Sequence, residues 1–374
     1  MKKLTLAYFG SPDFSAFFLE KILTDSDLKK VVDVKLVVTQ PDKPVGRKKI
    51  LTETPVKKVA KKYRIQILEV KSQKSKVKTK TQNFKTEKNN NRFLDLSCSF
   101  DICDLSFELD LCLVYAFSHI IPKDLLSVPK LGFWNIHPSL LPKYRGPSPI
   151  AYPLIFGEKE TGVTIIKMDE KIDHGPIIAQ EKLKIEDTDR RPDLEKKLTD
   201  LGFLMFKELI TKNIIKKSTD ACFKRLGRCA VSPKGDEHAH GSEKHSIKLL
   251  LTPQNHSQAT YTHLLKKEDG FIPLSTLKKA LKNEPLNFEE MPPILKEINT
   301  WKLEKRSSLE IIYNYFRGLY PWPGIWTLLP NGKRLKIIDM NFNVTGYTLH
   351  VTRVQLEGKK EVDFETFNKA YQVF

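Results

Sequence analysis

The first forty residues restrict the fold more than any other part of the chain. Residues 3–9 form a short apolar run, and residues 31–39 form a second one. Between them, the turn at residues 10–14 opens an expected helix over residues 15–23. A strand, a helix and a strand in so short a span favour a right-handed crossover between two parallel strands. We therefore expect an α/β fold with a doubly wound, mostly parallel, Rossmann-like sheet.

The turn after the first expected strand argues against one common function of such sheets. Residues 10–14 read Gly-Ser-Pro-Asp-Phe and contain a single glycine. A dinucleotide-binding turn carries three glycines in a Gly-x-Gly-x-x-Gly pattern, which let the backbone approach a pyrophosphate. The sequence therefore does not favour a dehydrogenase.

A segment in the middle of the chain gathers the candidate catalytic residues. A short apolar run places Asn135 and His137 two residues apart, so both side chains lie on one face if the run is a strand. Asp173 lies in a glycine-bounded loop, 169–175, directly after a second β-branched run at 162–168. If the two strands are neighbours, the Asp173 carboxylate can reach the His137 imidazole. Each of the three residues alone is more often structural than catalytic, and their grouping carries the hypothesis.

Two motifs in this segment resemble a known family. Residues 135–146 read Asn-Ile-His-Pro-Ser-Leu-Leu-Pro-Lys-Tyr-Arg-Gly, and residues 168–175 read Met-Asp-Glu-Lys-Ile-Asp-His-Gly. Both motifs, at this separation, resemble the folate-dependent formyltransferases. The resemblance implies a catalytic trio of Asn135, His137 and Asp173. It also implies a folate site lined by Ser139, Leu140, Leu141 and Pro142.

The sequence departs from the family pattern at two positions. His174 stands where the family usually has a threonine, and we expect it to alter the loop surface and not the chemistry. Ser118 stands where the family has a glycine, which leaves the backbone conformation of that turn open.

Formyl transfer to an amine is chemistry that the trio can support. The reaction needs a neutral amine, a stabiliser of the tetrahedral oxyanion and a path for the amine proton. Asn135 and His137 can donate hydrogen bonds to the oxyanion. Asp173 can orient His137, favour its protonated form and accept the amine proton through a water. The scheme requires no serine or cysteine nucleophile, and we expect no metal.

A basic loop over residues 40–49 points to RNA. It contains two prolines and one glycine and is too polar for a core. It resembles the segment that enters the tRNA acceptor end in the tRNA-modifying members of the family. By that resemblance the best candidate for direct RNA contact is Arg47, and the candidate phosphate ligands are Lys43, Lys48 and Lys49. The formal net charge of +18, from 63 Lys+Arg against 45 Asp+Glu, favours a polyanionic partner, although a lysine-rich composition alone is the alternative.

Two segments interrupt the expected domains. Residues 71–106 begin with a lysine-rich, nearly apolar-free stretch, which we interpret as a disordered insertion. After a helical pattern that ends near residue 215, residues 216–258 are expected to form a loop-like linker. Three histidines in that linker, His238, His240 and His245, match no zinc spacing.

The last third of the chain predicts a small β domain. Short apolar runs at 325–329, 335–341 and 347–355 are separated by Asn-Gly and Thr-Gly turns, which are hairpin signals. Short antiparallel strands with aromatic and basic residues suit an OB-like β-barrel, which often binds nucleic acid. We therefore expect a formyltransferase catalytic domain over 1–215 and a C-terminal OB-like tRNA-binding domain over 259–374.

Three functions compete on this sequence. The first is transfer of a formyl group from 10-formyltetrahydrofolate to the methionine amino group of initiator methionyl-tRNA, for translation initiation. The second is formyl transfer to a small amine such as glycinamide ribonucleotide or an amino sugar, which would need neither the basic loop nor the C-terminal domain. The third is an RNA-binding relative without activity, which the intact trio disfavours.

The remaining features bear on the compartment. The five cysteines include no Cys-x-x-Cys pair, and the chain contains no run of eighteen apolar residues and no recognisable signal peptide. We expect a monomeric protein without a membrane segment, located in a bacterial cytosol or in an organelle with bacterial-type initiation.

Overall fold

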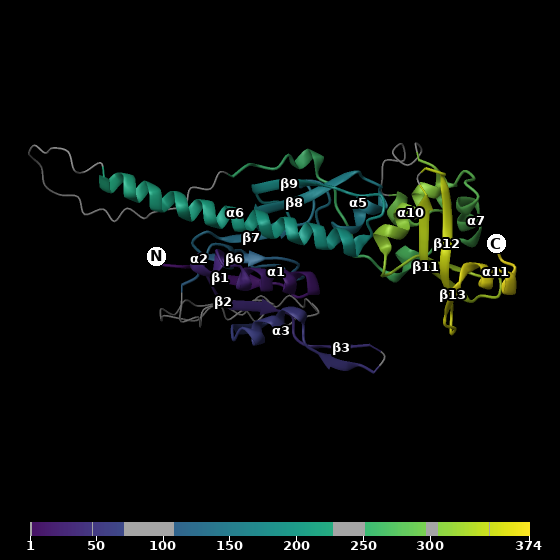
Figure 1. Cartoon of the computed structure of the whole chain (residues 1–374), viewed down its shortest axis with the longest axis horizontal. Helices are drawn as coiled ribbons and strands as arrows, with labels where there is room; N and C mark the ends of the chain where they lie inside the picture. Colours follow the sequence, from purple (N-terminus) through teal and green to yellow (C-terminus); the bar gives the residue numbers. More distant parts are fainter. Residues whose placement is uncertain (1, 47, 71–107, 227–250, 297–305, 344) are drawn as a thin grey trace, which may run out of the picture. The chain divides into compact units, whose positions relative to one another are not determined.

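The computed structural model describes residues 2–46, 48–70, 108–226, 251–296, 306–343 and 345–374, with the backbone alone over 213–226 (Figure 1). Three expectations fall outside these residues: the contact residue Arg47, the insertion 71–106 and the three linker histidines. The chain divides into two compact units that are not continuous in sequence. Unit 1 comprises Met1–His137, Thr164–Ala179 and Thr199–Gln254, and unit 2 comprises Pro138–Val163, Gln180–Leu198 and Asn255–Phe374.

A seven-stranded sheet in the order β5-β2-β1-β6-β7-β8-β9 forms the larger architecture. Strand β1 pairs in parallel with β2 and β6, β2 pairs in parallel with β5, and β6 pairs in parallel with β7, whereas β7 and β8 are antiparallel. The predicted doubly wound, mostly parallel fold class is therefore confirmed. The strands are β1 (Leu4–Phe9), β2 (Val32–Thr39), β5 (Gln66–Glu69), β6 (Leu111–Val114), β7 (Phe133–His137), β8 (Glu160–Lys167) and β9 (Ile177–Lys184).

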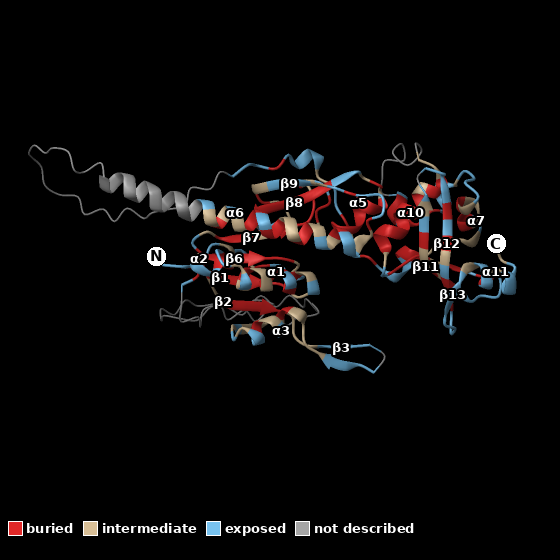
Figure 2. Ribbon diagram, viewed as in Figure 1, coloured by how far each residue is buried: buried red, intermediate tan, exposed pale blue. Residues whose placement is uncertain are grey.

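The central strands of unit 1 are buried on both faces, as expected for a parallel sheet covered by helices (Figure 2). Phe18 from the first helix packs edge-on against Tyr115, with ring centroids 5.2 Å apart, and contacts Phe203 and Phe206. Aromatic side chains therefore join α1 to the end of β6 and to α6. The helices with residues in unit 1 are α1 (Asp13–Thr24), α2 (Leu28–Val31), α3 (Pro55–Lys62), α4 (Lys123–Leu126) and α6 (Arg191–Leu226).

Helix α6 corrects one expectation. It continues to Leu226, so the segment 216–258 begins as helix and not as a loop. The reason is visible in the sequence, because neither glycine nor proline occurs between Gly202 and Gly227. No helix in the described part of the chain is both long and apolar enough to cross a membrane.

Unit 2 contains a four-stranded antiparallel sheet in the order β10-β11-β12-β13, which confirms the predicted small β domain. Helix α10 begins at a capping box, in which Ser307 and Glu310 bond each other's backbone N–H groups. A Cβ on Gly318 would lie 2.4 Å from Ile155, so α10 packs closely on α5 there. The elements are α5 (Ala151–Ile155), α7 (Leu274–Leu281), α8 (Pro293–Lys296), α10 (Ser308–Leu319), β10 (Trp326–Leu328), β11 (Arg334–Asn343), β12 (Thr348–Leu356), β13 (Glu361–Asp363) and α11 (Phe364–Tyr371).

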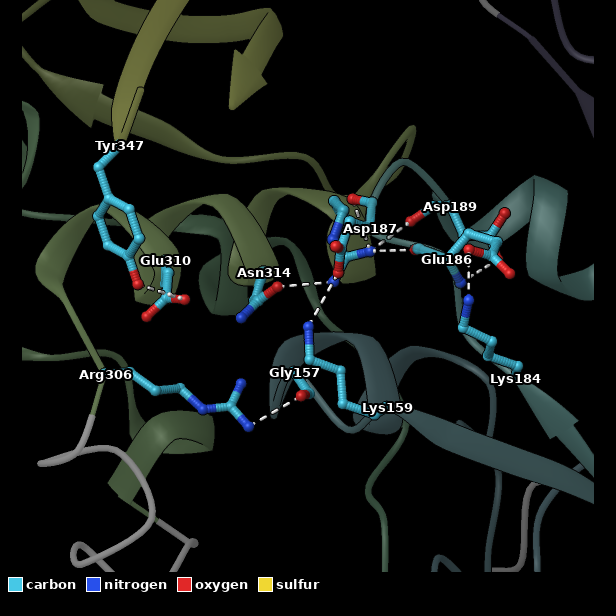
Figure 3. Close-up of polar contacts among 11 residues, drawn as sticks. Gly157, Lys159, Lys184, Glu186, Asp187, Asp189, Arg306, Glu310, Asn314 and Tyr347 are labelled. Atoms are coloured by element: carbon cyan, nitrogen blue, oxygen red, sulfur yellow. Dashed lines mark hydrogen bonds and ion pairs between the residues drawn. The ribbon is translucent and has the colours of Figure 1, made fainter. Parts of the chain in front are cut away.

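Polar contacts fasten the segments of unit 2 to each other (Figure 3). Arg306 donates a hydrogen bond of 2.8 Å to the carbonyl of Gly157, and the Lys159 ammonium lies 2.9 Å from the Asp187 carboxylate. The buried Arg317 guanidinium donates to three backbone carbonyls in the turn at residues 186–189. These three bonds tie α10 to the turn that precedes α6.

Candidate active site

Strand β7 carries the first two members of the trio. Asn135 and His137 pair with Ile166 and Thr164 of β8, and their side chains share one face of the strand. His137 is the last residue of the strand and is buried, with 4% of its surface exposed. The structure therefore places the imidazole at the carboxyl end of a central strand, which is where α/β sheets bind ligands.

The third member follows β8 in a loop that we call the Asp173 loop, residues 169–175. Asn135 Nδ2 donates a hydrogen bond of 3.0 Å to Asp173 Oδ1, and His137 Nδ1 lies 3.5 Å from the same oxygen. All three residues belong to unit 1. The structure thus brings the predicted trio together, while the catalytic role of each residue stays a prediction.

The geometry fixes how these side chains present their hydrogens. An ionised carboxylate only accepts hydrogen bonds, so Asp173 favours the forms of His137 that carry hydrogen on Nδ1. Among these forms, the imidazolium also carries hydrogen on Nε2, which can be donated to a substrate oxygen. Asn135 uses one amide hydrogen for Asp173, and its second amide hydrogen can be donated to a substrate oxygen. The arrangement can therefore polarise a carbonyl beside a carboxylate that is able to accept a proton.

His174 contacts another side chain of the Asp173 loop. Its Nδ1 lies 2.6 Å from Asp169 Oδ2, and Asp169 Oδ1 accepts the backbone N–H of Lys171. The pair closes the loop on itself, one residue away from Asp173. The expectation that His174 leaves the chemistry unchanged stays a prediction.

Gln254 is a contact of the loop that the sequence did not indicate. Its Nε2 donates hydrogen bonds to the carbonyls of Asp173 (3.0 Å) and Gly175 (2.7 Å), and its side chain is buried. The position falls in the expected linker 216–258, and a lone glutamine among polar residues carries no pattern that connects it to a loop 81 positions away.

The predicted folate-site residues, 139–142, lie in unit 2, and two of them make hydrogen bonds to other residues of that unit. Ser139 is fully buried, and its hydroxyl donates to the Lys143 carbonyl at 2.7 Å. Leu141 is buried and its carbonyl accepts a hydrogen bond from Gln180, whereas Leu140 and Pro142 are partly exposed. Their folate role stays a prediction.

The backbone question raised by Ser118 has a structural answer. The positive φ near this turn belongs to Ala116 (φ 56°) and not to Ser118. The Ser118 hydroxyl accepts a hydrogen bond of 2.6 Å from Gln40 Nε2. A side chain at position 118 is therefore accommodated and links the turn to Gln40, the first residue of the expected basic loop.

The basic segment is a hairpin and not an irregular loop. Strands β3 (Lys43–Val45) and β4 (Ile50–Thr52) pair antiparallel, and we call them and their turn the basic hairpin. Lys43, Lys48 and Lys49 are exposed, and their role as phosphate ligands stays a prediction. Apolar side chains on the hairpin are exposed as well, namely Val45 (56%), Ile50 (62%) and Leu51 (67%).

A lysine on α3 anchors the start of the hairpin. Lys57 Nζ lies 2.7 Å from Asp42 and 2.5 Å from Glu69. Hydrogen bonds to Asp42 and Glu69 raise the pKa of Lys57 well above its usual value. The residue next to the hairpin is thus tied to both α3 and β5.

The described residues contain no group of three or more histidine, cysteine, aspartate or glutamate side chains placed to hold a metal ion.

Comparisons with known proteins agree with the fold. A family model described as formyl transferase matches residues 4–210. Two solved structures share the fold at low identity. A 4-N formyltransferase from Francisella tularensis has a TM-score of 0.51 at 16% identity and covers 88% of this chain and 95% of its own. An N-formyltransferase from Helicobacter canadensis, in complex with folinic acid and dTDP-3-aminofucose, has a TM-score of 0.50 at 17% identity and covers 91% and 88%.

The chain belongs to the formyltransferase family. Within that family, the curated relatives that it resembles along most of its length are methionyl-tRNA formyltransferases. The one from Caldicellulosiruptor saccharolyticus is 30% identical over 394 aligned positions, which cover 99% of this chain and 98% of the relative. The one from Staphylococcus epidermidis is 32% identical over 334 positions, which cover 89% and 78%.

Proposed function

We propose that this protein transfers the formyl group of 10-formyltetrahydrofolate to the amino group of methionine on initiator methionyl-tRNA. The observation that carries the proposal is the convergence of Asn135, His137 and the Asp173 carboxylate at the end of β7. Membership of the formyltransferase family and the names of the full-length relatives support the reaction and the acceptor.

The trio has a role at each stage of the transfer. The neutral methionine nitrogen attacks the formyl carbon, and Asn135 and His137 donate hydrogen bonds to the oxygen that becomes negative. Asp173 holds His137 in place and accepts the proton lost by the nitrogen, directly or through a water. The bond from the formyl carbon to the folate nitrogen then breaks, that nitrogen takes up a proton, and the products are formylmethionyl-tRNA and tetrahydrofolate.

Substrate binding is assigned to residues outside the trio. We assign the folate to the segment that contains Ser139, Leu140, Leu141 and Pro142. We assign the tRNA acceptor end to the basic hairpin, with Arg47 in direct contact and Lys43, Lys48 and Lys49 on phosphates.

The division of labour along the chain follows from these assignments. The catalytic domain comprises residues 1–215, and the C-terminal β domain, residues 259–374, supplies further contacts to the tRNA. Such a protein works as a monomer in a compartment that initiates translation in the bacterial manner.

The decisive experiment is a comparison of acceptors. The purified protein is incubated with 10-formyltetrahydrofolate and, in separate reactions, with initiator methionyl-tRNA, elongator methionyl-tRNA, free methionine, glycinamide ribonucleotide and a nucleotide-linked amino sugar. Rapid formylation of initiator methionyl-tRNA alone is expected. Preferential formylation of a small amine would overturn the proposed acceptor, and no formylation of any acceptor would overturn the proposed reaction.

A further inference from the structure

Asp173 adopts a backbone conformation that needs support. Its φ is +50°, in the left-handed region that residues other than glycine rarely occupy. A residue in such a conformation persists only when its surroundings hold it there, and such residues cluster at active sites. The support of Asp173 is therefore part of how its carboxylate is aimed.

The Asp173 loop has little freedom at its C-terminal end. A Cβ on Gly175 would lie 1.9 Å from the carbonyl oxygen of Lys167, so the loop backbone passes directly against the end of β8. Any rotation of the peptides between Asp173 and Gly175 has to occur within this space. The directions of the Asp173 and Gly175 carbonyls depend on how the peptides of this part of the loop are oriented.

Gln254 binds both of these carbonyls. Its Nε2 is 3.0 Å from the Asp173 oxygen and 2.7 Å from the Gly175 oxygen. An amide nitrogen has two hydrogens, so one side chain bonds both carbonyls at once. Because both partners are acceptors, the nitrogen and not the oxygen of the carboxamide faces the loop.

The backbone around Gln254 is itself fixed. Thr252 and Ile177 exchange two backbone hydrogen bonds, of 2.8 and 2.9 Å, on the C-terminal side of the same loop. The Gln254 side chain is buried, with 6% of its surface exposed. The carboxamide is thus held on an anchored segment, which is the arrangement that positions a functional group accurately.

We propose that Gln254 is a positioning residue for Asp173. Asn135 holds the Asp173 carboxylate, and Gln254 holds the Asp173 carbonyl, so the residue is fixed at both ends in its left-handed conformation. This inference rests on the proposed function, since it assigns Gln254 a role in formyl transfer that acts through Asp173 alone.

The proposal predicts a loss of turnover without a loss of substrate binding. Gln254→Met keeps the length of the side chain and removes the donor, and a misplacement of about 1 Å can cost up to about a hundredfold in rate. We expect kcat to fall by about tenfold to a hundredfold, with KM for both substrates within about twofold of wild type. The matched control is Gln258→Met, an exposed glutamine in the same segment, which should retain full turnover.

A double mutant separates positioning from a merely structural role. If Gln254 acts through the Asp173 carboxylate, Gln254→Met should reduce the residual turnover of Asp173→Asn by no more than about twofold. A structural role would lower turnover by the same factor in both backgrounds. Gln254→Glu serves as a second variant, and circular dichroism melts ensure that every rate is measured on folded protein.

The outcomes distinguish the inference from the proposed function. Wild-type kcat retained in Gln254→Met and Gln254→Glu, or full additivity with Asp173→Asn, would overturn the positioning role while leaving formyl transfer intact. An inactive wild-type protein would instead contradict the proposed function itself.

Discussion

The Asp173 loop and the basic hairpin both extend from the sheet of unit 1, but they are built in opposite ways. The Asp173 loop is held by hydrogen bonds from Asn135, from Gln254 and between His174 and Asp169. The basic hairpin, in contrast, exposes its lysines and three large apolar side chains to solvent. A carboxylate that takes part in chemistry has to be fixed, whereas cations that bind a nucleic acid have to be accessible.

The comparison predicts that changes in the Asp173 loop act on turnover and that changes in the hairpin act on tRNA binding. A hairpin substitution that lowered kcat alone would contradict this division between the two regions.

The largest effect is expected for the trio itself. Asp173→Asn and His137→Ala should each lower kcat by at least about a hundredfold, the scale for lost oxyanion or proton-transfer help, while folate binding survives. Single-turnover rates and folate titration on the same preparations provide the measurement. Near wild-type turnover in either folded variant would contradict the catalytic assignment.

The hairpin should respond differently. Lys48→Ala/Lys49→Ala should raise KM for methionyl-tRNA by about tenfold, leave KM for the folate unchanged, and reduce the slope of log affinity against log salt by about one to two. Lys29→Ala/Lys30→Ala in α2 removes the same charge from another exposed pair of unit 1 and serves as the control. Equal losses in both double variants would show that overall charge, and not the hairpin, binds the RNA.

The sequence was sufficient to predict the sheet and the trio for a physical reason. Buried parallel strands read as continuous apolar runs, and the two-residue period of a strand puts Asn135 and His137 on one face without further information. The neighbouring positions of β7 and β8 then bring Asp173 to them. These properties are local, or follow from one strand pairing.

The sequence could not predict what depends on contacts between distant residues. Gln254 bonds a loop far away in the chain, and the two carbonyls that it binds belong to backbone, which carries no sequence signal. The His174–Asp169 pair also depends on how the loop turns, and the hairpin depends on the pairing of two very short strands. The helix α6 was expected to end near residue 215, because the polar residues after it show no apolar period. The helix continues to Leu226, since no glycine or proline interrupts it there.

A smaller effect on turnover is expected at His174. Removing the imidazole in His174→Ala leaves Asp169 with only its bond from the Lys171 backbone N–H, and we expect kcat to fall by about threefold. His174→Asn places an amide donor near the position of Nδ1 and should restore most of the rate. Steady-state kinetics of the two variants provide the measurement, and equal rates in both would remove the Asp169 contact from the explanation.

The smallest effect should come from Lys57, because it supports the hairpin only at its start. Lys57→Met removes the ammonium between Asp42 and Glu69, and we expect about 1 kcal/mol of lost stability and a twofold to threefold rise, approximately, in KM for tRNA, with kcat unchanged. The pKa of Lys57 is raised in the folded protein, so its contribution to stability is fully present below the unfolded lysine pKa of about 10.4 and is lost as the pH rises through the higher folded value. The difference in melting temperature between wild type and Lys57→Met should therefore stay constant from about pH 7 to 9 and shrink only at more alkaline pH.

The exposed Lys58 of the same helix is the matched control, and Lys58→Met should change neither stability nor tRNA binding. If Lys57→Met instead lowered kcat as strongly as a change in the Asp173 loop, the hairpin would have to take part in the chemical step, and the division between the two regions would fail.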